Sequence, residues 1–197
     1  MSRAVLKNEW LTVEISNVGA EIQSVRDRAG REYIWNGDPA YWPSRTPMLF
    51  PIVGGLKDDK FIYREKEYHL KKHGFTRNAD FVLEGSDSVS AVFLLSSTPE
   101  TEEGYPFQFE LRVIYRLMEN SIQVTYQVKN KTAGEMYFSI GAHEGYACPE
   151  GIGNYYLEFD REETAQAIDL NGNLLTSGRR LVLDHASQLD LDDSMFA

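Results

Sequence analysis

The segment FQFELRVIYRL, residues 107–117, decides the fold class because its side chains alternate with a period of two. Apolar residues occupy every second position and polar residues fill the positions between them, with Ile114 as the exception. After the short segment MENS, the sequence IQVTYQVKN at 122–130 alternates in the same way. The pair predicts a long antiparallel hairpin with one buried face and one wetter face.

Other segments favour the same class of fold. The segments LTVEI at 11–15, AVFLLS at 91–96, MYFSI at 136–140 and YYLEF at 155–159 are separated by turn-rich stretches. No segment of the sequence predicts an amphipathic helix, and the nearest candidate, HASQLDLDD at 185–193, is short and acidic. We therefore expect an all-β antiparallel sandwich or barrel. Without a repeat or linker, residues 1–197 form one predicted domain.

Charge and cysteine content restrict the partners and the location. The chain has a net charge of −10, which repels phosphate backbones, so we expect no nucleic-acid partner and no anionic membrane surface. Cys148 is the single cysteine, which excludes an internal disulfide and favours a reducing compartment. The N-terminal sequence lacks the apolar core of a signal peptide, and no run is long enough to span a bilayer. These features predict a soluble, cytoplasmic protein.

Several kinds of chemistry lack their motifs. The four histidines have neither the spacing of a zinc protease nor a second cysteine beside them, so we expect no metal. Neither a phosphate-cradling glycine loop nor a Gly-x-Ser-x-Gly elbow occurs, which argues against nucleotide chemistry and serine hydrolysis.

The remaining candidates are polar residues set among aromatic ones. Arg45 lies in WPSRTPMLFPIVGG (42–55), His73 and Arg77 lie in HGFTR (73–77), and His143 lies in SIGAHEGYACPE (139–150). An imidazole at a strand end beside small residues suits a general acid, although on spacing alone a structural role for His73 or His143 is equally plausible. The aromatic side chains suited to stack on a sugar ring are Trp35, Trp42, Phe75 and Tyr146.

These same segments carry a family resemblance. The segments GAEIQSV, LFPIVG, HGFTR, YPFQFELRVIYRL and MYFSIGAHEGYACP, in this order, resemble the aldose 1-epimerase (galactose mutarotase-like) family, in its LacX-like branch. The resemblance runs from about Leu11 to the C-terminus. It implies a β-sandwich of the galactose mutarotase (supersandwich) type, here C-terminally incomplete, and an activity that interconverts the α and β anomers of a hexose or hexose phosphate without a cofactor.

The resemblance also implies residue roles. Anomer exchange removes the proton from the C1 hydroxyl while the ring oxygen is protonated, so that the ring opens and closes on the other face. By resemblance His143 protonates the ring oxygen, and His73 hydrogen-bonds the sugar near the same atom. Arg45 binds sugar hydroxyls and stabilises developing negative charge, and Arg77 orients the loop or contacts the sugar.

Two departures from the family pattern qualify these roles. Glu144 follows His143 where many relatives have proline, and neighbouring side chains on a strand face opposite ways, so Glu144 is not expected to pair with His143. The family's catalytic glutamate has no counterpart in this sequence, and Asp192 and Asp193 are only the nearest candidates for its substrate-binding aspartate.

From the missing glutamate we expect a 197-residue chain that is nearly inactive and that self-associates through exposed sheet edges. The alternative is a non-catalytic carbohydrate-binding protein.

Overall fold

The computed structural model describes residues 3–196. Contacts divide the chain into two compact units, with the boundary between Ala147 and Cys148. The strands are β1 (Arg3–Lys7), β2 (Leu11–Ser16), β3 (Ile22–Asp27), β4 (Met48–Leu49), β5 (Lys60–Tyr63), β6 (Lys66–His69), β7 (Val82–Ser86), β8 (Ser90–Ser96), β9 (Phe109–Met118), β10 (Ser121–Asn130), β11 (Gly141–Ala142), β12 (Tyr156–Asn171) and β13 (Leu174–Asp190). The helical segments are α1 (Pro99–Gly104) and the 3-10 turns η1 (Lys57–Asp59), η2 (Thr76–Asn78), η3 (Ile152–Asn154) and η4 (Asp193–Phe196).

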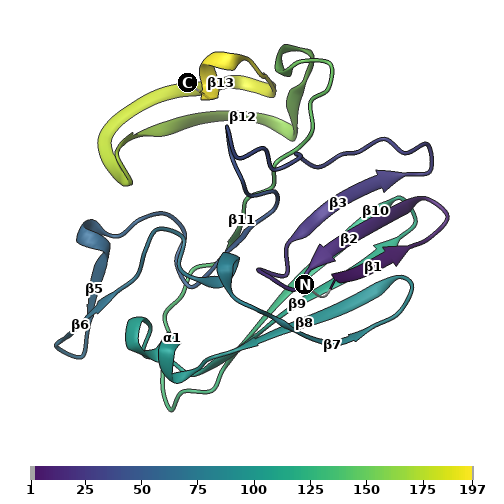
Figure 1. The fold of residues 1–197 in the computed structure, drawn as a ribbon. Coiled ribbons are helices and arrows are strands. Elements are labelled where there is room, and N and C mark those ends of the chain that lie inside the picture. Colours follow the sequence, from purple (N-terminus) through teal and green to yellow (C-terminus); the bar gives the residue numbers. More distant parts are fainter. Residues whose placement is uncertain (1–2, 197) are drawn as a thin grey trace. The chain divides into compact units, whose positions relative to one another are not determined.

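The first unit contains two larger antiparallel sheets and two two-stranded ones, β11-β4 and β5-β6 (Figure 1). Of the larger sheets, one has the strand order β1-β2-β3 and the other the order β10-β9-β8-β7. The predicted hairpin is present as β9 and β10, with Tyr115 opposite Val124. The expected all-β antiparallel class is confirmed.

The core of this unit draws on the alternating positions of both sheets. Val13 and Ile15 of β2 and Leu111 and Val113 of β9 are completely buried. They belong to one apolar cluster, which also contains Phe50, Phe93 and Phe109. The period-two pattern that predicts the strands therefore also predicts which of their faces is buried.

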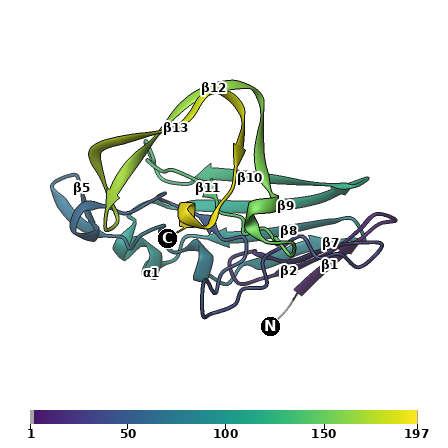
Figure 2. The same cartoon turned by 90° about the horizontal axis from the view of Figure 1, so that it is seen from above.

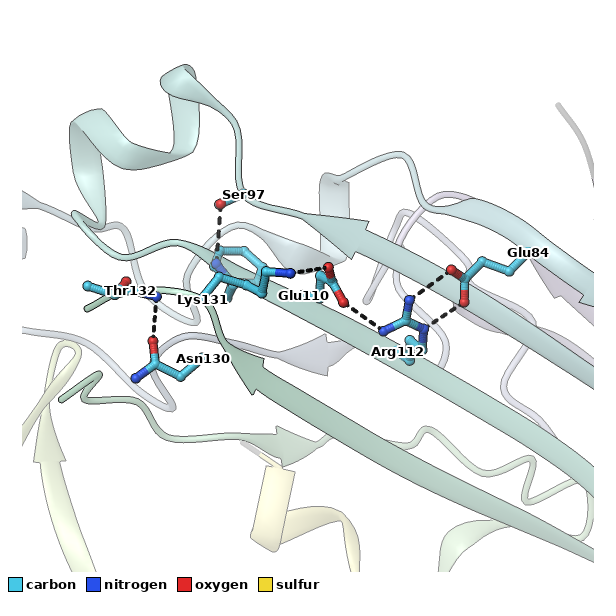
Figure 3. Close-up of polar contacts among 8 residues, drawn as sticks. Glu84, Ser97, Glu110, Arg112, Asn130, Lys131 and Thr132 are labelled. Atoms are coloured by element: carbon cyan, nitrogen blue, oxygen red, sulfur yellow. Dashed lines mark hydrogen bonds and ion pairs between the residues drawn. The ribbon is translucent and has the colours of Figure 1, made fainter. Parts of the chain in front are cut away.

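The polar face of the four-stranded sheet carries a network of charges (Figure 3). The guanidinium of Arg112 on β9 donates to both carboxylate oxygens of Glu84 on β7, at 2.7 and 2.9 Å. It also donates to Glu110, which accepts from Lys131 at 3.1 Å. The pKa values of Glu84 and Glu110 are lowered, chiefly because Arg112 hydrogen-bonds their ionised forms.

One predicted strand is absent, and one short helix was not predicted. The segment 136–140 is not a strand; of this region only Gly141 and Ala142 pair, as β11. The amide of Ser139 donates to the carbonyl of Pro51, but proline has no N–H to return, so no ladder forms there. The short helix α1 was not predicted, although Thr98 caps it and Pro99 opens it, which is a recognisable start signal.

The second unit is built on the hairpin of β12 and β13, the long curved pair in Figure 2. It confirms a strand at 155–159 and extends it to Asn171. The segment 185–193 continues β13 to Asp190 and is not helical there. Among residues 3–196, β12 and β13 pair only with each other. That residues 1–197 form a single domain remains a prediction.

The helices among residues 3–196 are all too short and polar to cross a membrane.

Candidate functional site

The two-residue strand β4 organises the candidate site. It pairs with β11, with Gly141 opposite Leu49 and Ala142 opposite Met48. His143 is the next residue after β11, so this pairing places it beside the segment that begins with Arg45 and continues into Phe50. Two of the predicted site residues are thereby brought together from distant parts of the sequence.

The HGFTR loop is attached to the same segment. Gly74 forms a parallel bridge with Phe50, whose carbonyl accepts from the amide of Phe75 at 3.2 Å. The hydroxyl of Thr76 is completely buried and bonds the carbonyls of Met48 and Phe50, at 3.0 and 3.3 Å. A Cβ on Gly74 would lie 2.2 Å from the carbonyl oxygen of Phe50, so this close approach requires glycine.

The backbone holds the neutral imidazole of His73 in one tautomer. The amide of Gly54 donates to its Nδ1 at 3.1 Å, and the amide of His73 donates to the carbonyl of Gly54 at 2.9 Å. An Nδ1 that accepts leaves the proton of the neutral imidazole on Nε2. Burial lowers the pKa of His73, and the positive charges of Lys72 and Arg77 lower it further. The side chain therefore offers a neutral Nε2–H donor.

The two candidate histidines lie near each other, and His143 also lies beside the indole ring of Trp42. The ring centres of His73 and His143 are 6.2 Å apart, and those of Trp42 and His143 are 5.1 Å apart. Trp42 is fixed in turn by its carbonyl, which accepts from the Nε1–H of Trp35 at 2.8 Å. A Cβ on Gly145 would lie 2.8 Å from the Trp42 ring, so the absence of a side chain lets the indole approach this loop.

Arg45 joins this group through its backbone and its side chain. Its carbonyl accepts from the amide of Gly145 at 2.7 Å, two residues after His143. Its Nη1 donates to the carbonyl of Gln23 at 2.6 Å. A guanidinium has five N–H donors, and within residues 3–196 the guanidinium of Arg45 makes this one hydrogen bond. Four donors therefore remain for a ligand.

Arg77 takes part mainly through its charge. It lies in η2, and its carbonyl packs against Gly19, where a Cβ would approach within 2.9 Å. Its positive charge lowers the pKa of His73, after burial and together with the charge of Lys72. Lys71 is exposed, and His69 is exposed and lies 3.2 Å from Glu67.

Glu144 acts on a different set of groups from its neighbour. The pKa of Tyr126 is raised to about 12, first by burial and then by the negative charge of Glu144. The same charge raises the pKa values of Tyr115 and Tyr146 after burial. His143, by contrast, contacts Trp42 and His73. This separation agrees with the prediction that Glu144 is no direct partner of His143.

Other candidates have structural surroundings. Phe75, suggested as a sugar-stacking ring, packs instead against Phe50, Tyr105 and Phe109 in the core. Its position directly after Gly74 turns it toward the core side of the loop. Asp192 accepts hydrogen bonds from the amide and hydroxyl of Ser194, which lower its pKa. Within residues 3–196 no three His, Cys, Asp or Glu side chains are grouped so as to hold a metal ion.

The comparison with known families matches residues 2–186 to the model described as aldose 1-epimerase. A curated relative is Protein LacX, plasmid, from Lactococcus lactis subsp. lactis. It is 38% identical over 205 residues, which cover 98% of this chain and 69% of the relative.

Solved structures give the same result. A galactose mutarotase related enzyme from Lactobacillus acidophilus has a TM-score of 0.94 and 38% identity, with 99% of this chain and 67% of that chain covered. A galactose mutarotase-like protein from Lactobacillus casei ATCC 334 has a TM-score of 0.88 and 26% identity, with 96% and 67% covered. The fold is therefore galactose mutarotase-like, and the chain belongs to the aldose 1-epimerase family.

Proposed function

We propose that this protein interconverts the α and β anomers of a hexose by acid–base ring opening. The observation that carries the proposal is the pair of imidazoles whose ring centres lie 6.2 Å apart, with Nδ1 of His73 accepting from Gly54. Arg45 is hydrogen-bonded to the loop that follows His143. Family membership supports the isomerase class and a small sugar as the ligand.

Each residue has a defined part in the proposed reaction. His143 gives its proton to the ring oxygen as the ring opens and takes it back on closure. His73 donates its Nε2–H to a sugar oxygen, because its Nδ1 is already occupied by Gly54. Arg45 donates its remaining N–H groups to hydroxyls and stabilises negative charge that develops on the sugar. Arg77 adds, after burial and Lys72, to the lowering of the pKa of His73.

A base must remove the C1 hydroxyl proton, and the family resemblance gives this role to a glutamate without a counterpart in residues 1–197. We therefore propose that the 197-residue chain binds the sugar and interconverts its anomers only slowly. Binding and turnover are separate measurements in the test for this reason.

The test follows the optical rotation of freshly dissolved α-D-galactose and α-D-glucose with the wild-type chain and with His143→Ala, and measures sugar binding by titration. We expect binding that depends on Arg45 and His73 and a low turnover that His143→Ala abolishes. His69→Ala is the matched control, because His69 is an exposed histidine of the same unit.

A fully active wild-type chain would contradict the slow turnover, and wild-type turnover that survives His143→Ala would contradict the role of His143. Binding without any turnover in any variant would favour the carbohydrate-binding alternative.

We also propose that the chain self-associates. β10 pairs only with β9, and both outer edges of the β12–β13 pair are unpaired within the described residues. This pair exposes apolar side chains, among them Leu170 and Leu175. A cytoplasmic location is proposed from the single cysteine.

A further inference from the structure

We propose that Glu21 is a positioning residue that sets the place of the sugar-binding Arg45. The proposal rests on the function given above for Arg45. Glu21 lies between the turn that ends at Ala20 and the first residue of β3, Ile22. Its carboxylate bonds Gln23, Arg45 and Thr46, and its effect would reach the sugar through Arg45.

The carboxylate of Glu21 holds two successive backbone amides. Its Oε1 accepts from the amide of Arg45 at 2.7 Å and from the amide of Thr46 at 2.9 Å. Its Oε2 accepts from the Nε2 of Gln23 at 2.7 Å. One side chain at the start of β3 therefore fixes the backbone of a segment more than twenty residues further along the chain.

The backbone of β3 completes the same attachment. The carbonyl of Gln23 accepts from the Nη1 of Arg45 at 2.6 Å, and the carbonyl of Ile22 accepts from the hydroxyl of Thr46 at 3.1 Å. On the other side of the arginine, a Cβ on Gly37 would lie 3.0 Å from its Nε. The guanidinium is thus confined between Gly37 and the start of β3.

The attachment extends to the acid histidine. The carbonyl of Arg45 accepts from the amide of Gly145 at 2.7 Å, and Gly145 follows His143 by two residues. The amide of Arg45 donates to Glu21, and the carbonyl of Arg45 accepts from the amide of Gly145. A shift of the Arg45 backbone would therefore move the guanidinium and the loop of His143 together.

Glu21 is a carboxylate that does not neutralise the arginine. No ion pair between Glu21 and Arg45 is formed in the part of the chain that the structure describes; the contact is to the backbone amide. The guanidinium therefore keeps its positive charge and four of its donors for a ligand. A carboxylate paired with the guanidinium would have occupied one or two of these donors and offset its charge.

The experiment compares Glu21→Ala and Glu21→Gln with the wild-type chain. Gln keeps an acceptor oxygen for both amides, whereas Ala removes it. Glu14→Ala is the matched control, since Glu14 lies on the neighbouring strand and pairs with Arg3 and Arg26. The first readout is the dissociation constant for D-galactose, and the second is the NMR exchange rate of the Arg45 guanidinium protons with water.

We expect Glu21→Ala to weaken galactose binding at least tenfold and to speed guanidinium exchange, while Glu21→Gln restores most of both. Glu14→Ala leaves both unchanged, even where it lowers the thermal midpoint. Binding and exchange that are the same in Glu21→Ala and wild type would overturn the proposal. If wild type binds neither D-galactose nor D-glucose, the proposed function fails, and the exchange rates alone decide whether Glu21 positions Arg45.

Discussion

The tautomer of His73 is the most specific chemical feature of the site. Its Nδ1 accepts from the amide of Gly54, which leaves Nε2–H as the one N–H donor of the neutral imidazole. The residue makes this contact with a positive φ of 68°. Few non-glycine residues adopt such a conformation.

Substitution of His73 separates its two nitrogen functions. In His73→Asn the side-chain oxygen replaces Nδ1 and keeps the bond from Gly54, whereas in His73→Gln the amide nitrogen replaces Nε2 and keeps the donor. We expect His73→Asn to weaken sugar binding by about tenfold or more, or about 1.4 kcal/mol, and His73→Gln to weaken it less. Calorimetric titration with D-galactose measures both, and equal binding by the two variants would contradict a donor role.

The lowered pKa of His73 sets the direction of its pH dependence. Its ordinary value is 6.5, and burial with two nearby cations moves the folded-state pKa below it. The neutral imidazole is therefore favoured by folding: its contribution to stability is complete above about pH 6.5 and is lost as the pH falls through the lowered folded-state pKa. The same protonation breaks the bond from Gly54, so sugar binding is expected to decline over this interval too.

At the scale of elements, the charged face of the four-stranded sheet makes stability depend on acid. The pKa values of Glu84 and Glu110 lie below their ordinary 4.5 because Arg112 bonds the ionised carboxylates. Their contribution is present above about pH 4.5 and is lost as the pH falls through the folded-state values.

We expect Arg112→Gln to destabilise the protein at pH 7 and to have less effect near pH 3, where the carboxylates are protonated. Urea unfolding at the two pH values measures the difference, with Lys7→Gln on β1 as the control. A loss of stability that does not change between the two pH values would show that Arg112 acts through packing of its stem instead.

Strands with strict alternation could be predicted from the sequence, and short or irregular segments could not. β9 buries every second side chain and β10 partly buries every second one, so their pattern determines both the structure and the face that packs inward. β4 and β11 have two residues each, too few for a periodic signal. Their pairing depends on contacts between distant segments.

The candidate site was predictable only through resemblance. Arg45, His73 and His143 carry recognisable motifs, and the structure brings their segments together at β4. Glu21 and Gly54 were missed, because neither a carboxylate that accepts from a distant backbone amide nor a glycine amide that donates to a distant imidazole leaves a local pattern. The Gly-Ala-Glu segment before β3 was the available signal for Glu21, as part of the family match.

For the whole molecule, the unpaired edges of β12 and β13 predict association. Leu170 and Leu175 lie opposite each other in this pair and are 61% and 70% exposed. We expect the sedimentation coefficient of the 197-residue chain to rise with concentration, and the double variant Leu170→Lys, Leu175→Lys to reduce this rise, because charges on an edge disfavour strand pairing.

The control for this experiment is Tyr41→Lys, which replaces an even more exposed large side chain, 82% exposed, that lies outside the strands of the described residues. A sedimentation coefficient that is constant for wild type over a hundredfold range of concentration would contradict self-association. A reduction by Tyr41→Lys as large as that by the double variant would assign the effect to surface apolarity in general.

The small size of β4 has a consequence for how the protein acquires its site. β9 and β10 adjoin in the sequence and close over a short turn, but β4 must meet β11 and the His73 loop across long intervening segments. Contacts of long sequence separation form late in folding because the loops they close are costly. A folding chain can therefore hold its central hairpin and still have no binding site, because the contacts that place the two histidines close much longer loops.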